Sequence, residues 1–380
     1  MSITTLNKLR VIIDEIVPYS LLEWFQTNYA TWLLSRTFFS LFFVPLFQHC
    51  ASFGEKNQNL TYYIVDRDSW AGNGLFSCVN AIVSAIEYAV ERGYIPVVDM
   101  KNGDNAYLYP DEVGKINAWE YYFQQPLENI NQTISSLEEA YRSKNVIINN
   151  MHHGGIVQAL YPAGYPSLLD AGSHNRIMRR RSIQYKKYVR LNKNTEKYID
   201  EQYKKIIHDG DRVLGICVRG GEYRFSRPFG HPIQPEIDDI ISQVHSSMKS
   251  WNCNKIFLTT EDIDILQIFT QEFGDAVIST DRSYIKYVIC DSDEGRYLKH
   301  VRPHERENEK YLQGLEYLTD IVILSRCNSI IGGTSCGMIA AVLMSNGFEH
   351  QYFFDCGVFG ITDKRICGTF SSTKGTWVIK

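Results

Sequence analysis

An alternation of short apolar runs with longer amphipathic runs constrains the fold of this chain more than any other feature. The first half shows it in four consecutive pieces: an apolar run, a glycine-containing turn, an amphipathic stretch ending in glycine, and a second apolar run, at 61–65, 70–77, 78–93 and 94–100. A strand, a helix and a second strand in this order form the parallel crossover of a Rossmann-like sheet. The sequence therefore predicts an α/β protein.

A second alternating series begins at residue 212. Its predicted strands run into polar or glycine-containing turns, at 212–221, 255–262 and 328–333. Ligands of doubly wound sheets bind beyond the carboxyl ends of the strands, so these turns are expected to form the site.

The two series predict two domains, 1–205 and 206–380. A chain of 380 residues is long enough for two such cores. A basic helical stretch at 176–206 ends the first domain, and we interpret its charges as a solvated face.

Residues 19–50 form an aromatic and apolar segment within the first domain. Glu23 and Arg36 divide it into pieces too short to span a bilayer. A pair of core helices and an interfacial patch that docks on a membrane both remain open. Asp14 and Glu15 interrupt the first apolar stretch, so no secretory signal is predicted. We expect a cytoplasmic protein, with peripheral membrane contact as one of the two readings of this segment.

Composition excludes several classes of protein. With 44% hydrophobic and 22% charged residues, the chain is neither disordered nor a polytopic membrane protein. A net charge of −4 provides no basic field for nucleic acid. The nine cysteines contain no Cys-x-x-Cys pair, which predicts reduced thiols and no zinc site. Four Asp-x-Asp pairs occur, but pairs this short arise by chance, and no metal is predicted.

Several residues of the second half suit a ligand that carries phosphate. Arg219 follows a predicted strand and precedes two glycines, so its guanidinium can pair bidentately with a diphosphate. Ser335 begins a predicted helix, whose N–H groups and dipole favour phosphate. Glu261 and Asp262 end another strand and can accept hydrogen bonds from a ribose or a base, while Asp320 lies on a long predicted helix. Each residue alone is equally typical of a structural role, but together they predict a sugar-nucleotide pocket.

These residues lie in segments that resemble the donor domain of α1,6-fucosyltransferases, including core and nodulation-factor fucosyltransferases. The family pattern is a strand ending in His-x-Arg-Arg-x-Asp, then His-Pro-Ile, a helix, and a strand ending in Thr-Asp-Asp. Matching residues stand at Arg219, Glu222, 231–233 and 260–262. The segment 318–337 is similar to the last motif of the family, with Asp320, Ser335 and Cys336 in it, and Gly72 and Gly74 resemble its glycine turn against the donor diphosphate.

The resemblance implies a GT-B-like fold with two facing Rossmann-like domains. It also implies an inverting glycosyltransferase that transfers fucose from GDP-fucose to a free or lipid-linked glycan, without a cofactor or obligatory metal. Catalytic roles are implied for Arg219 and Glu222, with Asp66, Asp68, His152 and His153 as further candidate bases. Donor-binding roles are implied for Gly72, Gly74, Arg219, His231, Glu261, Asp262, Asp320, Ser335 and Cys336.

The sequence also departs from the family pattern. Cys217 replaces the histidine of the motif, and Gly220 replaces its second arginine. Arg227 stands where core fucosyltransferases carry a proposed catalytic glutamate, and Tyr223 stands at the neighbouring lysine position. Arg224 and Arg227 are candidates for the missing positive charge. Two alternatives therefore remain: a glycosyltransferase that uses another nucleotide sugar, and a non-catalytic glycan-binding protein with the same fold.

Overall fold

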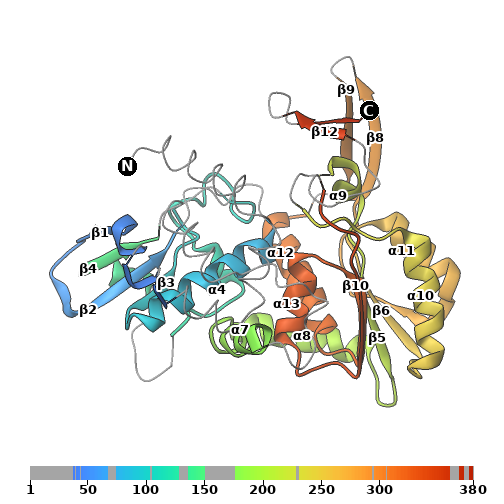
Figure 1. Cartoon of the computed structure of the whole chain (residues 1–380), viewed down its shortest axis with the longest axis horizontal. Helices are drawn as coiled ribbons and strands as arrows, with labels where there is room; N and C mark the ends of the chain where they lie inside the picture. Colours follow the sequence, from blue (N-terminus) through green and yellow to red (C-terminus); the bar gives the residue numbers. More distant parts are fainter. Residues whose placement is uncertain are drawn as a thin grey trace. The chain divides into compact units, whose positions relative to one another are not determined.

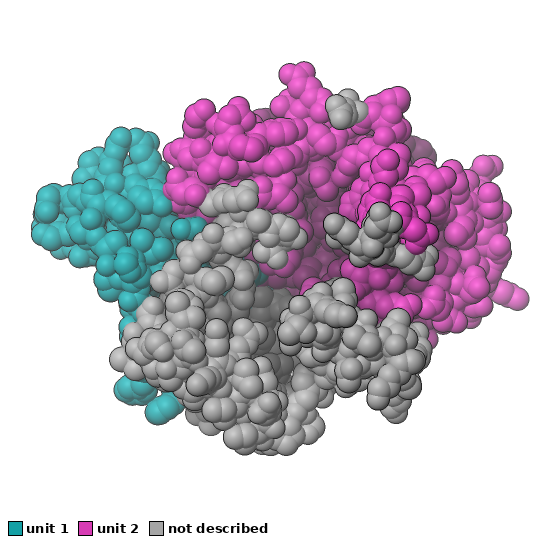
Figure 2. Space-filling model, turned by 90° about the horizontal axis from the view of Figure 1, so that it is seen from above, with its two compact units in different colours: residues 1–68, 81–98, 126–184 teal, residues 69–80, 99–125, 185–380 magenta. Residues whose placement is uncertain are grey.

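The computed structural model divides the chain into two compact units (Figure 2). Unit 1 comprises residues 1–68, 81–98 and 126–184, and unit 2 comprises 69–80, 99–125 and 185–380. The structure describes residues 37–38, 40–42, 44–66, 74–102, 105–127, 136–149, 176–227, 231–292, 295–304, 306–359, 368–371 and 376–379. The predicted boundary between residues 205 and 206 stays a prediction.

Only the end of the aromatic segment 19–50 belongs to the described residues. Phe38, Leu41 and Phe42 are exposed there, and the rings of Phe38 and Phe42 lie 5.2 Å apart. Among the helices that the structure describes, none combines the length and the apolar character needed to cross a membrane.

Unit 1 contains a four-stranded sheet in the order β1–β4–β2–β3 (Figure 1). Its strands are β1 (His49–Ala51), β2 (Lys56–Val65), β3 (Ile95–Val98) and β4 (Ser143–Ile148). β2 pairs in parallel with β3 and β4, and β1 adds an antiparallel edge. Helix α4 (Leu75–Glu91) connects β2 to β3 and ends before Gly93, which has a φ of +72° that favours glycine. The predicted parallel crossover is therefore confirmed.

Unit 2 contains a five-stranded parallel sheet in the order β11–β10–β5–β6–β7. Its strands are β5 (Val213–Cys217), β6 (Lys255–Thr259), β7 (Val277–Ile278), β10 (Ser329–Gly333) and β11 (His350–Phe354). Read from β7, the strands occur in the chain order third, second, first, fourth and fifth, which is the Rossmann order. The order reverses between β5 and β10, and ligands of this fold bind outside the carboxyl ends of the strands at such a switch point.

Helices lie on both sides of this sheet (Figure 1). On one side are α10 (Ile237–Ser250) and α11 (Ile263–Phe273), whose buried Val244 and Phe269 belong to one core cluster with Ile256 of β6. On the other side are α12 (Glu309–Leu324) and α13 (Cys336–Met344). The remaining helices are α5 (Leu137–Ala140), α7 (Arg176–Tyr188), α8 (Lys193–Ile206), α9 (Gly221–Ser226) and the short 3-10 turns η1 (Val44–Phe47), η2 (Ala118–Tyr121) and η4 (Gly274–Ala276). The predicted α/β class and the parallel strands in each half are confirmed.

Two antiparallel hairpins were not predicted from the sequence. They are β8 (Lys286–Ser292) with β9 (Gly295–Val301), and β12 (Gly368–Ser371) with β13 (Thr376–Ile379). The β8–β9 hairpin projects beyond the sheet end where α9 lies (Figure 1), and Tyr287 packs closely against Gly221 at the start of α9. The Asp-x-Asp pair at 291–293 overlaps the end of β8, and no strand is predicted there from the sequence.

Candidate functional site

The turns after β5, β6 and β10 meet at the switch point of the unit 2 sheet. Cys217, the last residue of β5, is in register with Gly332 of β10 on one side and with Thr259 of β6 on the other. Arg219 and Glu261 each follow the end of their strand by two residues, which brings them to the same edge. The structure thus brings together the predicted residues Arg219, Glu261, Asp262 and Ser335.

Arg219 is held between a carboxylate and an aromatic ring. Its Nη1 lies 3.6 Å from Oε1 of Glu261, and its guanidinium carbon lies 5.1 Å from the ring centre of Tyr223. A quarter of the Arg219 side chain remains exposed. Glu261 raises the pKa of Arg219 above its ordinary value, so the guanidinium is always charged. Burial raises the pKa of Glu261, but Arg219 and Arg282 outweigh burial and lower it. The side chain is therefore a partly exposed, pre-oriented cation.

The two carboxylates after β6 also bind the backbone of the turn after β5. Glu261 Oε1 accepts a hydrogen bond from Gly220 N at 3.1 Å, and Asp262 Oδ2 accepts one from Gly221 N at 3.2 Å. Asp262 Oδ1 also caps α11 by accepting from Asp264 N at 3.0 Å. A β-carbon at position 220 would lie 2.8 Å from Asp262 Cβ. This close packing explains why glycine, rather than the second arginine of the fucosyltransferase pattern, stands at position 220.

Asp320 lies in the interior, paired with Arg282. Its Oδ2 is 2.5 Å from Arg282 Nη1 and 3.4 Å from Thr259 Oγ1, and Thr280 also donates its hydroxyl. The side chain of Asp320 is 2% exposed, and that of Arg282 is 6% exposed. Burial raises the pKa of Asp320, with Arg282 opposing the rise. Sequence reasoning missed Arg282, because it lies in a connection without a motif. The contacts of Asp320 with Arg282, Thr259 and Thr280 hold it in the interior of unit 2. Its predicted donor-binding role stays a prediction.

Ser335 caps the helix that begins at the switch point. Its Oγ accepts a hydrogen bond from Met338 N at 3.1 Å. The loop before it is held by Gln234, whose Nε2 donates to the Thr334 carbonyl at 2.8 Å. Cys336 is half-buried at the first position of α13. The amino end of α13 therefore lies at the predicted edge with its capping bond formed.

Buried Cys217 and half-buried Tyr317 both lie close enough to Arg219 to interact with its charge. Burial raises the pKa of Cys217 to about 12, so the residue that replaces the family histidine is a protonated thiol and not a base. Burial raises the pKa of Tyr317 as well, while the charge of Arg219 opposes this rise. Sequence reasoning missed Tyr317, although it lies three residues before Asp320 on the same helix.

His231 contacts the site through Tyr223. Its Nδ1 lies 2.6 Å from the Tyr223 hydroxyl, and burial lowers its pKa. Arg224 also contacts this turn: its Nε donates to the Arg219 carbonyl at 3.4 Å, and its Nη2 donates to the Pro235 carbonyl at 2.6 Å. Its Nη1 lies 3.5 Å from Glu236. That Arg224 supplies the positive charge missing at position 220 stays a prediction.

The remaining candidates are placed only in part. Gly74 immediately precedes α4, and a β-carbon there would meet nothing within 4 Å. Glu222 lies in α9, but its side chain is outside the described part of the structure. The candidates Gly72, Asp68, His152 and His153 lie outside the described residues.

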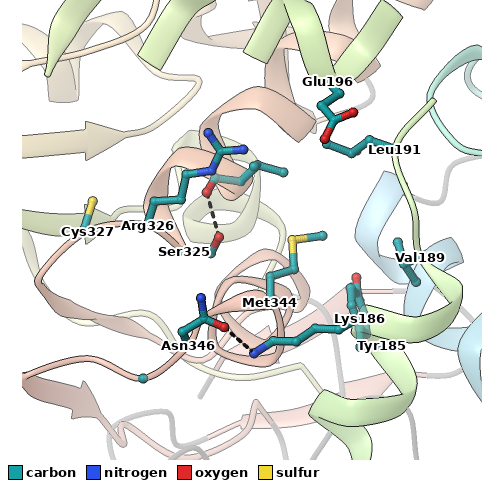
Figure 3. Close-up of a pocket in the computed structure, with 12 residues that line it drawn as sticks. Tyr185, Lys186, Val189, Leu191, Glu196, Ser325, Arg326, Cys327, Met344 and Asn346 are labelled. Atoms are coloured by element: carbon teal, nitrogen blue, oxygen red, sulfur yellow. Dashed lines mark hydrogen bonds between the residues drawn. The ribbon is translucent and has the colours of Figure 1, made fainter. Parts of the chain in front are cut away.

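A cavity of about 640 Å³ lies at the amino edge of the unit 2 sheet, and Figure 3 shows the residues that line it. It is lined by residues from α7, α8 and the connection between them, and by residues at the ends of α12 and α13, near the amino end of β10. Lys186 points across it to Asn346, with 3.0 Å between Nζ and Oδ1, and Arg326 pairs with Asp200 at 2.7 Å. Since α/β sheets bind ligands at the carboxyl edge, this cavity is not the predicted donor site.

Comparison with known proteins identifies similar solved structures. The fucosyltransferase NodZ from Bradyrhizobium is 16% identical, with a TM-score of 0.42, over 75% of this chain and 94% of that one. NodZ α-1,6-fucosyltransferase soaked with GDP-fucose is 15% identical, with a TM-score of 0.41, over 75% and 93%. POFUT1 in complex with GDP is 10% identical, with a TM-score of 0.41, over 80% and 100%.

No protein-family model matches the chain, and no curated protein sequence is significantly similar to it. Fucosyltransferases are among the solved structures similar to this chain. The likeness is distant, and the site residues themselves carry the functional proposal.

Proposed function

We propose that the protein is a glycosyltransferase whose nucleotide-sugar donor binds at the carboxyl edge of the unit 2 sheet. GDP-fucose is the donor that the motif resemblance implies, and a glycan is the implied acceptor. The observation that carries the proposal is the position of Arg219: it follows the central strand at the switch point and is charged, pre-oriented and partly exposed.

The proposed chemistry needs a cation at this position. An acceptor hydroxyl attacks the anomeric carbon of the donor, and the bond from that carbon to the phosphate oxygen breaks. The electron pair leaves with the nucleoside diphosphate, and the hydroxyl proton passes to a base. Negative charge therefore develops on the diphosphate in the transition state, where a preoriented guanidinium stabilises it most. We assign this role to Arg219, and Glu222 remains the candidate base on α9.

Glu261 has a positioning role in this proposal. Its carboxylate holds the guanidinium of Arg219 and the backbone N–H of Gly220 at the same time. The carboxylate of Glu261 also interacts with Arg282, which lowers its pKa together with Arg219. Arg282 is in turn paired with Asp320, so Glu261 belongs to a network of two carboxylates and two guanidinium groups that holds Arg219 in place.

Calorimetric titration with GDP, UDP, CDP and ADP tests the proposal. A charge-assisted hydrogen bond contributes about 1.5–3 kcal/mol, so Arg219→Ala is expected to weaken nucleotide binding by roughly 10- to 150-fold. Arg219→Lys is expected to lie between the wild type and the alanine variant, because lysine keeps the charge but not the bidentate geometry.

Arg212→Ala is the matched control. Arg212 immediately precedes β5, at the opposite end of the same strand, and pairs with Glu349. The control removes the same charge from the chain, so it is expected to leave nucleotide affinity unchanged. Equal affinities of the wild type, Arg219→Ala and Arg212→Ala, or no binding of any nucleoside diphosphate by the folded wild type, would reject the proposed donor site. Release of labelled sugar from the donor separates an enzyme from a non-catalytic binding protein.

A further inference from the structure

A small cavity lined by tyrosines lies in unit 2, apart from the Arg219 turn. Its volume is about 250 Å³, just below the roughly 300 Å³ at which pockets for drug-sized ligands begin. This tyrosine pocket has room for one small ring. Its lining residues are Tyr107, Tyr109, Glu112, Tyr121, Asn308 and Tyr311.

The aromatic wall of the tyrosine pocket is held rigidly from behind. The ring of Tyr311 stacks on buried Tyr122 at 5.7 Å and 9°, and meets Tyr121 edge-on at 5.2 Å and 74°. The Tyr122 hydroxyl donates to the Tyr311 carbonyl at 2.8 Å. A β-carbon at position 314, one turn further along α12, would collide with the Tyr122 ring, so glycine makes room for this packing. The pocket is therefore preformed, which reduces the entropy lost when a ligand binds.

One carboxylate stands among these rings. Glu112 Oε2 accepts a hydrogen bond from Tyr109 N at 2.8 Å, and Oε1 accepts one from the Tyr121 hydroxyl at 3.4 Å. Each carboxylate oxygen has two lone pairs, so both can accept another hydrogen bond from a ligand hydroxyl. Burial raises the pKa of Tyr121 to about 12, and its phenol remains protonated. The pocket thus combines flat apolar faces with fixed hydrogen-bonding groups.

The charges around the tyrosine pocket select a neutral ligand. The carboxylate of Glu112 repels a phosphate or another anion. The ammonium of Lys310 lies 5.2 Å from the ring centre of Tyr109 and donates to the Leu108 carbonyl. It already occupies the cation–π position on that ring, and it repels a second cation. A neutral ring with an apolar face and several hydroxyl groups fits these conditions, and a pyranose is such a ring.

The tyrosine pocket lies toward the same edge of the unit 2 sheet as the candidate donor site. Tyr311 is in the first turn of α12, and Tyr317 follows it by six residues, or about 9 Å along the helix axis. Tyr317 lies close to Arg219: the guanidinium opposes the rise in the pKa of Tyr317, and Tyr317 contributes to the raised pKa of Arg219. Burial raises the pKa of Tyr107, and Arg219 also acts on it from the donor side, in the opposite direction. A glycan of a few sugars can therefore reach from one site to the other.

We propose that the tyrosine pocket binds one pyranose unit of the glycan acceptor, with Tyr121 and Tyr311 against its apolar face and Glu112 accepting from its hydroxyl groups. The acceptor role rests on the proposed glycosyltransferase function, whereas the binding of a neutral sugar does not. The two statements are therefore tested separately.

Ligand-observed NMR titration of the full chain tests sugar binding without any donor. The probes are the methyl glycosides of glucose, galactose, mannose and N-acetylglucosamine, with tetramethylammonium and inorganic phosphate as charged competitors. We expect at least one glycoside to bind with a dissociation constant on the order of 1 mM, typical of so small a ligand. Binding of tetramethylammonium or phosphate in preference to every glycoside would overturn the proposal, and so would the absence of glycoside binding.

Three variants then assign the binding to the tyrosine pocket. Tyr121→Ala and Glu112→Gln are each expected to weaken glycoside binding about tenfold, because they remove a ring contact and a charged acceptor, respectively. Glu112→Gln keeps an oxygen for the Tyr109 N–H, so it remains informative if Tyr121→Ala fails to fold. Tyr352→Ala, which removes an exposed tyrosine of β11, is the matched control with unchanged affinity. Unchanged affinity in a folded Glu112→Gln variant would refute the assignment.

GDP titration of the same variants separates the two proposals. Glu112→Gln is expected to retain the nucleotide affinity of the wild type. Failure of GDP binding with intact glycoside binding would reject the donor site and the acceptor role, but not the sugar pocket.

Discussion

The buried pair Arg282–Asp320 gives the sharpest prediction about stability. Both side chains are less than a tenth exposed, and their closest atoms are 2.5 Å apart. Arg282→Met leaves the carboxylate of Asp320 buried with only hydroxyl partners, Thr280 and Thr259. Removing one partner of a buried pair costs about 3–5 kcal/mol, a large share of the roughly 5–15 kcal/mol that stabilises a typical protein.

The effect is measurable by heat and by denaturant. For a domain of 150–250 residues, each kcal/mol shifts Tm by about 2–4 °C, so Arg282→Met is expected to lower Tm by roughly 6–20 °C. Urea unfolding followed by circular dichroism gives the free energy of unfolding directly. The double variant Arg282→Met/Asp320→Leu removes both charges and is expected to recover most of this loss, because an apolar pair avoids the desolvation cost.

Two results would refute this reasoning. One is an Arg282→Met variant within about 0.5 kcal/mol of the wild type, as is usual for surface changes. The other is a double variant whose loss equals the sum of the two single losses, because residues that interact are not additive.

Two further predictions concern the turn after β5. Glu261 has a lowered pKa in the folded protein, so its stabilising effect is present above its unfolded pKa of about 4.3 and is lost as the pH falls. The stability difference between the wild type and Glu261→Gln, measured by urea unfolding, should therefore shrink below about pH 4, and a constant difference would contradict the ion pair. Gly220→Ala brings a β-carbon to 2.8 Å from Asp262 Cβ and should cost about 1–3 kcal/mol of unfolding free energy, whereas Gly74→Ala, in open space, should stay within about 0.5 kcal/mol. Equal effects of the two alanines in the same urea assay would show that the space at position 220 is not restricted.

Much of the site could be predicted because strand ends are local features. Arg219, Glu261 and Ser335 each follow a recognisable apolar run, and parallel strands carry the residues after them to a common edge. The contacts of Asp320 could not be predicted in this way. Its partner Arg282 is 38 residues away and follows a strand of only two residues, so no motif marks it.

The tyrosine pocket shows the same limit more strongly. Tyr107 and Tyr121 come from a polar, irregular stretch, whereas Tyr311 comes from α12, and the bond between Tyr122 and Tyr311 joins residues 189 positions apart. A high tyrosine content did not show which rings would meet. That depended on the packing of α12 and on a glycine at position 314.

The sequence by itself determined the α/β class, the parallel crossovers and the residues at the ends of the central strands, because hydrophobic periodicity reports the burial of each element separately. The tertiary structure decided the Rossmann order of the second sheet, the pairing of Asp320 with Arg282, the glycine at position 220 and the tyrosine pocket. Each of these depends on which distant segments approach one another, and a pattern along one segment carries no information about its neighbours in space.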